Sequence, residues 1–208
     1  MVRLQCVRVG MFQTNCYIVY DEEKKEGIIV DPGDNGDYLK GCIEGLEITP
    51  AAILLTHAHL DPIGAVEDLK SAYNIPFYVG EADVAMLKDP RLNMGGFSIE
   101  LGEGDRALKD GEILSLAGME IEVIATPGHT PGGVSFYFKN EGFLLSGDTL
   151  FRYSWGRTDF PGGSERQLMQ SIREKLLPLP AETLVYPGHE GATTIKAERA
   201  VHDYTEEN

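Results

Sequence analysis

The chain has 208 residues, of which 42% are hydrophobic and 25% charged, and this ordinary globular composition argues against long disordered segments. Its 33 acidic side chains outnumber 18 basic ones, and the formal net charge of −15 argues against nucleic acid or an anionic membrane as a partner, because phosphate contacts need basic clusters. The three cysteines, Cys6, Cys16 and Cys42, form no Cys-x-x-Cys pair, which favours a reducing compartment and small buried side chains over a disulfide framework.

Neither a membrane span nor a secretory signal is expected. No run approaches the roughly 18 apolar residues of a transmembrane helix, and Arg3 and Arg8 interrupt the N-terminus where an apolar signal segment would stand. We therefore expect a cytoplasmic protein. The length suggests one large domain or two small ones, with enough chain to bury a sizeable core. With no convincing linker in the sequence, we expect a single domain over residues 1–208.

Hydrophobic periodicity predicts strands alternating with helices. A period-2 pattern predicts a strand over 2–6, and two apolar runs, 15–20 and 27–31, predict a hairpin around a charged turn. The next predicted elements are a helix over 38–46, a strand over 51–56, a helix over 63–73, a strand over 75–79 and a helix over 82–87. After a loop over 91–103 come strands over 113–116, 120–125, 134–138 and 142–146, a helix over 168–176, a strand over 183–186 and a helix over 194–204. This alternation predicts an α/β layered domain.

Polar residues follow four of the apolar strands at the points where those strands end. His57 and His59 follow the first of them, His129 the second, Asp148 the third and His189 the fourth. Rigid strands that carry polar residues on their terminal loops are a common way to build a site, so we expect these side chains to converge. Imidazole with carboxylate and no thiolate suits Zn²⁺, Fe²⁺ or Mn²⁺, which predicts a transition-metal site.

The pair Asp61-Pro62 has two possible interpretations, one functional and one structural. Asp61 lies two residues after His59 and is a candidate for the metal site, where it would orient or deprotonate a water molecule. Aspartate is also a favoured N-cap and proline is favoured at the first helical position, so the pair also predicts the start of the helix over 63–73. His202 stands in the charged tail and is expected to be a solvated helix residue.

A loop after Asp148 holds two candidates for substrate binding. Arg157 could bind a substrate carboxylate through two hydrogen bonds, and an ion pair with Asp159 is an equally open alternative. Tyr153 lies in the same loop and could line a pocket or cover an edge of the core.

Several motifs resemble the metallo-β-lactamase-fold hydrolases: Thr14-Asn-Cys-Tyr17, Ile29-Val-Asp-Pro-Gly33, Thr56-His-Ala-His-Leu-Asp61, Gly128-His129, Ser146-Gly-Asp148 and Pro187-Gly-His189. Gly156-Arg-Thr-Asp-Phe160 resembles the glyoxalase II-like and persulfide-dioxygenase branches. The resemblance implies a four-layer αββα sandwich with metal at one edge of its two sheets. It further implies a first metal held by His57, His59 and His129, with Asp148 bridging to a second metal held by Asp61, the next residue, Asp148 and His189.

The chain departs from the family pattern His-x-His-x-Asp-His at its last position, where Pro62 stands. Proline has no side-chain ligand, so the second site keeps only Asp61, Asp148 and His189. We therefore expect one strong zinc site and a weakened second site, with iron as an alternative metal.

The resemblance implies a glyoxalase II-like metallo-hydrolase that uses a metal-bound hydroxide on thioesters, hydroxyacylglutathione or a related ester among them. The full-length enzyme adds a C-terminal helical segment that helps to bind glutathione, and this chain, which ends soon after His189, is expected to lack it. One alternative is a mononuclear-iron persulfide dioxygenase with iron on His57, His129 and Asp148. Another is a weakly active or inactive metal-binding member, because of Pro62. In each case the expected partner is a small molecule, and the oligomeric state stays open.

Overall fold

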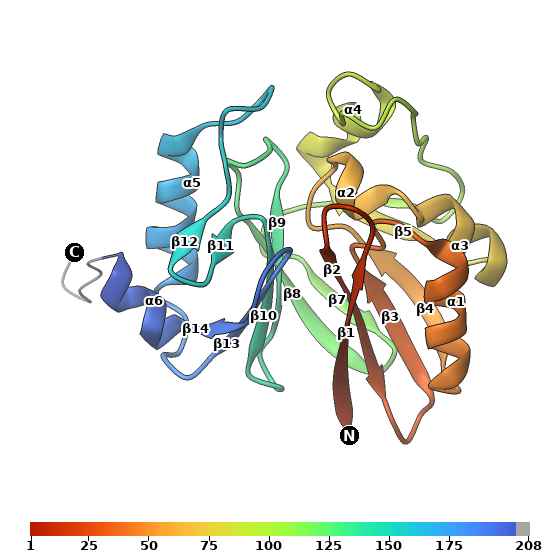
Figure 1. The fold of residues 1–208 in the computed structure, drawn as a ribbon. Coiled ribbons are helices and arrows are strands. Elements are labelled where there is room, and N and C mark those ends of the chain that lie inside the picture. Colours follow the sequence, from red (N-terminus) through yellow and green to blue (C-terminus); the bar gives the residue numbers. More distant parts are fainter. Residues whose placement is uncertain (203–208) are drawn as a thin grey trace.

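Two six-stranded sheets lie face to face in the computed structural model, which describes residues 1–202, and helices cover their outer faces (Figure 1). The layers therefore follow the order helices, sheet, sheet, helices. This is the four-layer αββα arrangement that the resemblance implies.

The first sheet has the order β1-β2-β3-β4-β5-β6, antiparallel from β1 to β3 and parallel from β3 to β6. Its strands are β1 (Val2–Val9), β2 (Thr14–Asp21), β3 (Glu26–Val30), β4 (Thr49–Leu54), β5 (Phe77–Gly80) and β6 (Arg106–Leu108). The helices on this side are α1 (Gly36–Gly45), α2 (Leu60–Ile63), α3 (Val66–Tyr73), the 3₁₀-helix η1 (Glu81–Asp83) and α4 (Val84–Lys88). Figure 1 shows α1 and α3 against the outer face, and α2 and α4 near the upper end.

The second sheet has the order β14-β13-β10-β9-β8-β7, in which only β10 and β13 form a parallel pair. Its strands are β7 (Ile113–Leu116), β8 (Met119–Ala125), β9 (Val134–Phe138), β10 (Phe143–Gly147), β13 (Leu184–Pro187) and β14 (Thr193–Thr194). A small hairpin consists of β11 (Leu150–Phe151) and β12 (Ser154–Trp155). The outer helices are α5 (Glu165–Ser171), continued by the π-helical turn η2 (Ile172–Leu176), and α6 (Ile195–Val201).

Three hydrophobic cores hold the four layers together, one at each boundary between layers. Successive side chains of a strand point to opposite faces, so Ile53 of β4 packs toward α1 and α3, while its neighbour Leu54 packs between the sheets. The inter-sheet core also contains Phe136, and the third core joins Leu144 to α5 and α6. Strands buried on both faces read as continuous apolar runs, which explains why 51–56 shows no alternation.

Four short strands escape prediction from the sequence: β6, β11, β12 and β14. Each has two or three residues, too few to show a period, and each is defined by pairing with a neighbouring strand. The loop over 91–103 is confirmed, because the structure contains neither helix nor strand there. Strand β1 continues to Val9, three residues beyond its predicted end.

The predicted helix over 63–73 is two helices, α2 and α3, separated at Gly64 and Ala65. Here the chain packs against the turn after β3, and the amide of Ala65 donates to the carbonyl oxygen of Pro32 (2.8 Å). A Cβ on Gly64 would lie 2.1 Å from the carbonyl oxygen of Gly33, so the close approach of the two backbones requires glycine. Tertiary contact therefore interrupts a helix that the apolar pattern alone would continue.

The expected cap at Asp61 and Pro62 is wrong. His59 occupies the N-cap position of α2 with extended backbone and Leu60 is its first residue, so Asp61 and Pro62 lie inside the first turn. An aspartate in that turn is still favourable beside the positive end of the helix.

Two expectations for single side chains are also wrong. His202 is buried, with 6% of its surface exposed, because it packs beside Glu198 and the ring of Trp155. Cys6 is exposed, whereas Cys16 is buried and Cys42 partly buried, as expected. The predicted helix over 194–204 is α6, and residues 203–204 lie outside the described residues. Among residues 1–202, no helix is both long and apolar enough to cross a bilayer.

Candidate metal centre

The predicted ligands meet at one edge of the two sheets, because each follows the C-terminal end of a strand. His57 and His59 follow β4 of the first sheet. His129, Asp148 and His189 follow β8, β10 and β13 of the second sheet. The parallel pairing of β10 with β13 brings the last two of these ends side by side. Both sheets therefore contribute to one cluster.

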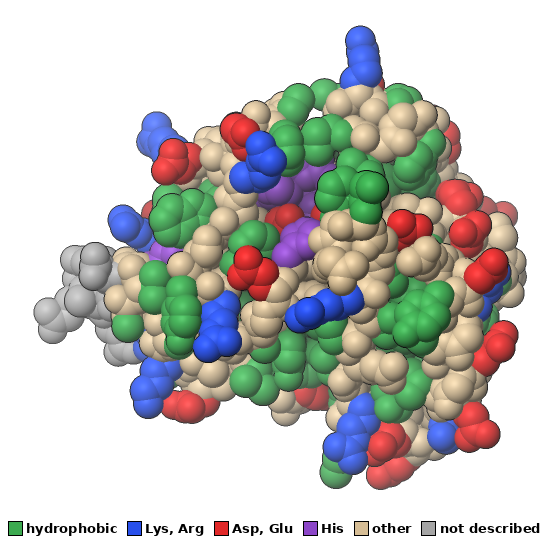
Figure 2. Space-filling model, viewed as in Figure 1, with side chains coloured by type: hydrophobic (Ala, Val, Ile, Leu, Met, Phe, Trp, Pro, Cys, Tyr) green, Lys and Arg blue, Asp and Glu red, His purple; other side chains and the backbone are tan. Residues whose placement is uncertain are grey.

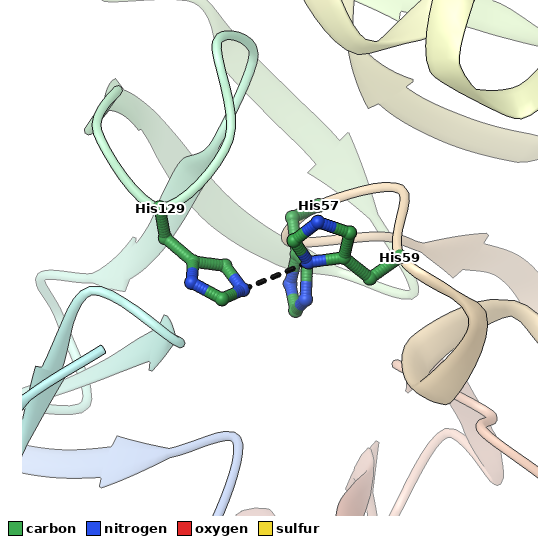
Figure 3. A group of neighbouring side chains, drawn as sticks. All are labelled: His57, His59 and His129. Atoms are coloured by element: carbon green, nitrogen blue, oxygen red, sulfur yellow. Dashed lines mark hydrogen bonds between the residues drawn. The ribbon is translucent and has the colours of Figure 1, made fainter. Parts of the chain in front are cut away.

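Three histidines form the buried part of the cluster (Figure 3). His59 Nδ1 lies 2.9 Å from His129 Nε2, and the ring of His57 lies 4.8 Å from that of His129 and nearly perpendicular to it. None of the three exposes more than 4% of its surface. Burial lowers the pKa of each imidazole, that of His59 to about 4, so the three rings are neutral at neutral pH. Neutral imidazoles are the form that binds metal.

Two carboxylates and a fourth histidine complete the cluster. Asp61 Oδ1 lies 4.0 Å from His57 Nε2, and Asp148 Oδ2 lies 3.6 Å from His129 Nε2. His189 Nε2 lies 3.0 Å from Asp61 Oδ2 and 3.5 Å from Asp148 Oδ2. Every predicted ligand is therefore in contact with another predicted ligand.

The charges in the cluster follow from burial and these contacts. Hydrogen bonding to Asp61 raises the pKa of His189 to about 9. Burial disfavours the carboxylate of Asp61, but the hydrogen bond from His189 outweighs it and lowers the pKa of Asp61. Burial, reinforced by the charge of Asp61, raises the pKa of Asp148 to about 7. Two acids crowded in a buried site favour a cation between them.

Unsatisfied buried atoms show that the cluster fits a metal ion. Among residues 1–202, His57 Nε2 and Asp148 Oδ1 are buried and have no hydrogen-bond partner, although buried polar atoms are nearly always paired. Candidate ligand atoms lie within 4.8 Å of one another in two groups, one of three histidines and one that joins His57 to Asp61 and Asp148. A set of imidazoles and carboxylates suits Zn²⁺ or Fe²⁺.

Pro62 contributes no ligand to this cluster. It is buried in the first turn of α2, directly after Asp61. The remaining second-site candidates, Asp61, Asp148 and His189, nevertheless lie close together.

Hydrogen bonds behind the histidines set their orientation. His129 Nδ1 lies 2.7 Å from the carbonyl oxygen of Arg157, to which it can donate, and this leaves Nε2 toward the cluster. His57 Nδ1 lies 3.0 Å from Thr56 Oγ1, and Thr56 in turn donates through both its hydroxyl and its amide to Asp31. Burial raises the pKa of Asp31 to about 8. Asp31 lies in a motif that carries the family resemblance, but its contact with the first histidine loop could not be read from the sequence.

The N-terminal motif Thr14-Asn-Cys-Tyr17 supports the turn that presents His189. The side chains of Asn15 and Tyr17 both donate to the carbonyl oxygen of Pro187, at 2.9 and 2.6 Å. The amide of Asn15 also donates to the carbonyl oxygen of Gly188 (2.8 Å). Strand β2 of the first sheet therefore fixes a ligand loop of the second.

Asp83 is a supporting residue that sequence reasoning missed. Its carboxylate is fully buried and accepts hydrogen bonds from the amide of Ala58 (3.0 Å), the hydroxyl of Thr130 (2.7 Å) and the amide of Gly132 (2.6 Å). Ala58 lies between the first two histidines and Thr130 directly follows His129. Asp83 therefore joins two ligand loops, and no local motif marks it.

All members of the cluster except His57 line a cleft of about 430 Å³. Figure 2 shows histidine and acidic side chains deep in a hollow, with hydrophobic side chains and some charged ones around its rim. Arg157 lines this cleft, and its guanidinium pairs with Asp159 through two hydrogen bonds of 2.7 and 2.6 Å. Tyr153 is 55% exposed and lines a separate depression beside Arg152 and Leu184. The structure therefore brings Arg157, and not Tyr153, to the cluster.

Comparisons with known proteins agree with this architecture. Residues 9–189 match the family model "Metallo-beta-lactamase superfamily". A Bacillus subtilis (strain 168) protein named "Probable metallo-hydrolase YqgX" is 39% identical, over 92% of both chains. The "Hydroxyacylglutathione hydrolase GloC" of Haemophilus influenzae (strain ATCC 51907 / DSM 11121 / KW20 / Rd) is 37% identical, over 95% of both chains.

Several solved structures also have the same fold as this chain. The BLEG-1 B3 metallo-beta-lactamase has a TM-score of 0.89 and 40% identity, and the match covers 95% of this chain and 97% of that one. TTHA1623 in a di-iron-bound form has a TM-score of 0.83 and 37% identity, covering 95% and 98%. ETHE1 from Myxococcus xanthus has a TM-score of 0.81 and 25% identity, covering 96% and 83%. With the αββα fold and the histidine–aspartate cluster at its edge, these matches place the chain in the metallo-β-lactamase superfamily of metal-dependent hydrolases.

Proposed function

We propose that the protein hydrolyses thioesters, or related esters, as a glyoxalase II-like metallo-hydrolase. The observation that carries this proposal is the buried cluster itself, in which His57 Nε2 and Asp148 Oδ1 have no hydrogen-bond partner and whose other side chains line a cleft of about 430 Å³. The similarity to GloC supports an acylated thiol as substrate and makes hydroxyacylglutathione the reference compound.

One divalent metal, zinc in the first place and iron in the second, would be held by four side chains: His57, His59, His129 and Asp148. Such a metal, when bound, lowers the pKa of a water molecule toward about 7 and so supplies hydroxide at neutral pH. Asp61 is positioned beside His57 to orient that water or accept its proton, and His189 holds the Asp61 carboxylate by a hydrogen bond of 3.0 Å. Hydrolysis adds the water oxygen to the acyl carbon and breaks the C–S bond, which yields a carboxylate and a thiol.

The test combines metal analysis with turnover. Protein purified without added metal should contain about one zinc or iron per chain and should hydrolyse hydroxyacylglutathione or a simpler thioester. His57→Ala should lose the metal, and Asp61→Asn should lower kcat by about 10²–10⁴-fold, the usual contribution of a general base. Asp68→Asn, which changes an exposed aspartate of α3, is the matched control and should retain full activity. Metal-loaded protein that hydrolyses neither thioesters nor esters would refute the proposal.

A persulfide dioxygenase is the second candidate. Pro62 removes a ligand only from the second site, and the two-histidine, one-carboxylate set of His57, His129 and Asp148 is enough for mononuclear iron. Iron together with oxygen uptake on glutathione persulfide, and no thioester turnover, would favour it over hydrolysis. Bound metal with neither activity would favour a binding protein instead.

A further inference from the structure

Apolar side chains make up most of the cleft above the metal cluster. Six of them line it: Phe12, Leu60, Met94, Phe151, Trp155 and Phe160. Phe12 is 51% exposed and Trp155 is 42% exposed, although large hydrophobic side chains are normally buried. A contiguous exposed apolar surface of this kind marks a binding site.

The apolar wall begins at the cluster and continues outward from it. The ring of Phe160 meets that of His59 edge to face, with 5.4 Å between their centroids. The ring of Phe151 meets that of His189 in the same way at 6.2 Å. If the carbonyl group of a substrate lay at the cluster, its substituent would therefore lie directly against aromatic rings.

The cleft has few positively charged side chains that could bind an anionic group. Arg157 is the one lysine or arginine among the described residues that line it, and its guanidinium already pairs with Asp159 and lies 4.0 Å above the ring of Phe160. The exposed residue Glu190 also lines the cleft, and the chain as a whole carries a formal net charge of −15. Carboxylates or phosphates on a substrate would meet like charge, which is costly.

We infer that the cleft selects acyl thioesters, or esters, with an apolar acyl group and a leaving thiol or alcohol that carries no carboxylate or phosphate. This inference rests on the proposed hydrolase function and names its substrate class. The carbonyl group would lie at the cluster, Phe160 and Trp155 would cover the acyl chain, and binding would come from the burial of apolar surface.

Two matched comparisons test the selection in the metal-loaded protein. Octanoyl and acetyl thioesters of N-acetylcysteamine differ only in the apolar chain, and kcat/KM should be at least ten-fold higher for octanoyl. Octanoyl thioesters of glutathione and of N-acetylcysteamine differ only in the leaving thiol, which carries carboxylates in glutathione. The value of kcat/KM should be no higher for the glutathione thioester. Trp155→Ala and Phe12→Ala should each remove most of the octanoyl preference. Tyr38→Ala, which changes an exposed aromatic side chain on α1 outside the cleft, should leave it intact.

Binding can be followed without turnover, because Trp155 is the single tryptophan of the chain. The octanamide analogue of the N-acetylcysteamine thioester, in which nitrogen replaces sulfur, should shift Trp155 emission in a saturable way. S-methylglutathione, which has the charges of glutathione and no acyl chain, should leave the emission unchanged at the same concentrations.

The outcomes separate the inference from the proposed function. Saturable binding of the octanamide without hydrolysis of any thioester would refute the hydrolase and keep the apolar selection. Hydrolysis with a ten-fold or greater preference for the glutathione thioester, lost in Arg157→Ala, would keep the hydrolase and overturn the selection. Equal rates for octanoyl and acetyl thioesters would also overturn it.

Discussion

Asp83 shows how a single buried carboxylate can organise a metal site that it does not touch. It occupies the N-cap position of α4, yet its side chain does not cap that helix and turns instead to the loops that carry the histidines. Burial raises the pKa of Asp83, and the hydrogen bonds from Thr130, Gly132 and Ala58 oppose this rise. The carboxylate therefore does not cap its own helix but connects two loops that are distant in the sequence.

We predict that Asp83→Ala weakens metal binding by about 10–100-fold, as loss of a supporting partner of the ligands commonly does. Leaving the buried donors of Ala58 and Gly132 without an acceptor should also cost about 1–3 kcal/mol of folding free energy for each group. Isothermal titration with zinc and urea unfolding measure the two effects. Glu81→Ala, which changes an exposed acid of the same turn, is the control. Unchanged metal affinity in Asp83→Ala would show that the loops hold their geometry without it.

Pro62 gives a second prediction at the scale of one residue. Pro62→His restores the side chain that the family pattern has at this position, so the metal content should rise from about one toward two per chain. The di-iron-bound form of TTHA1623, at 37% identity, shows that two metals fit this fold. Elemental analysis measures the ratio, and Pro62→Ala is the control that removes proline without adding a ligand. An unchanged ratio would mean that Pro62 does not limit the second site.

Among the elements, the β11–β12 hairpin depends on α6. Glu198 of α6 is fully buried, and both of its carboxylate oxygens accept a hydrogen bond from the amide of Tyr153, at 3.1 Å. Tyr153 has φ +62° at the turn of the hairpin, a conformation that is uncommon for non-glycine residues. The same hairpin places Phe151 and Trp155 in the cleft wall. A C-terminal helix thus shapes the substrate side of the site.

We predict that Glu198→Ala loosens this wall and raises KM for apolar thioesters more than it lowers kcat, because the metal cluster lies outside the hairpin. Quenching of Trp155 fluorescence by acrylamide should increase as the ring becomes more accessible. Glu198→Gln keeps an acceptor for the Tyr153 amide and should restore part of the affinity, while Glu182→Ala, at an exposed position, should change neither quantity. If kcat fell by the same factor as KM rose, and acrylamide quenching stayed unchanged, Glu198 would have only a general structural role.

At the scale of the molecule, the cluster joins the two sheets. Three of its side chains follow β4 of the first sheet and three follow strands of the second, so a metal ion would link the halves of the sandwich. Metal present at about 100 times its dissociation constant adds about 2.7 kcal/mol to stability. For a chain of this size each kcal/mol shifts Tm by about 2–4 °C.

We therefore predict that removing the metal with a chelator lowers Tm by about 5–11 °C, measured by calorimetry. Adding zinc back should restore it, and His57→Ala should show little response to either treatment. A chelator that strips the metal completely without changing Tm would mean that the cluster does not link the sheets.

The sequence alone predicts much of the fold, for reasons that are local. Strands such as β4 and β9 are long enough to show buried apolar runs, and His57, His129 and His189 each follow such a run. Ligand chemistry is a property of residue types, so the kind of site was also predictable. Strands of two or three residues and the break at Gly64 were not predictable, because pairing and backbone packing decide them.

Other features belong to the tertiary structure alone, because their partners are distant in the chain. Asp83 reaches Ala58 across 25 residues and Gly132 across 49, and Glu198 reaches Tyr153 across 45. No periodicity connects such positions. Arg157 is a different case: its partner Asp159 is only two residues away and was named as an alternative from the sequence, but only the folded chain shows the guanidinium against Asp159. The sequence by itself determined the longer strands, the order of the ligands and the chemistry of the site. Only the folded chain decided the shortest strands, which residues support the ligands and what lines the cleft, since those depend on contacts between elements.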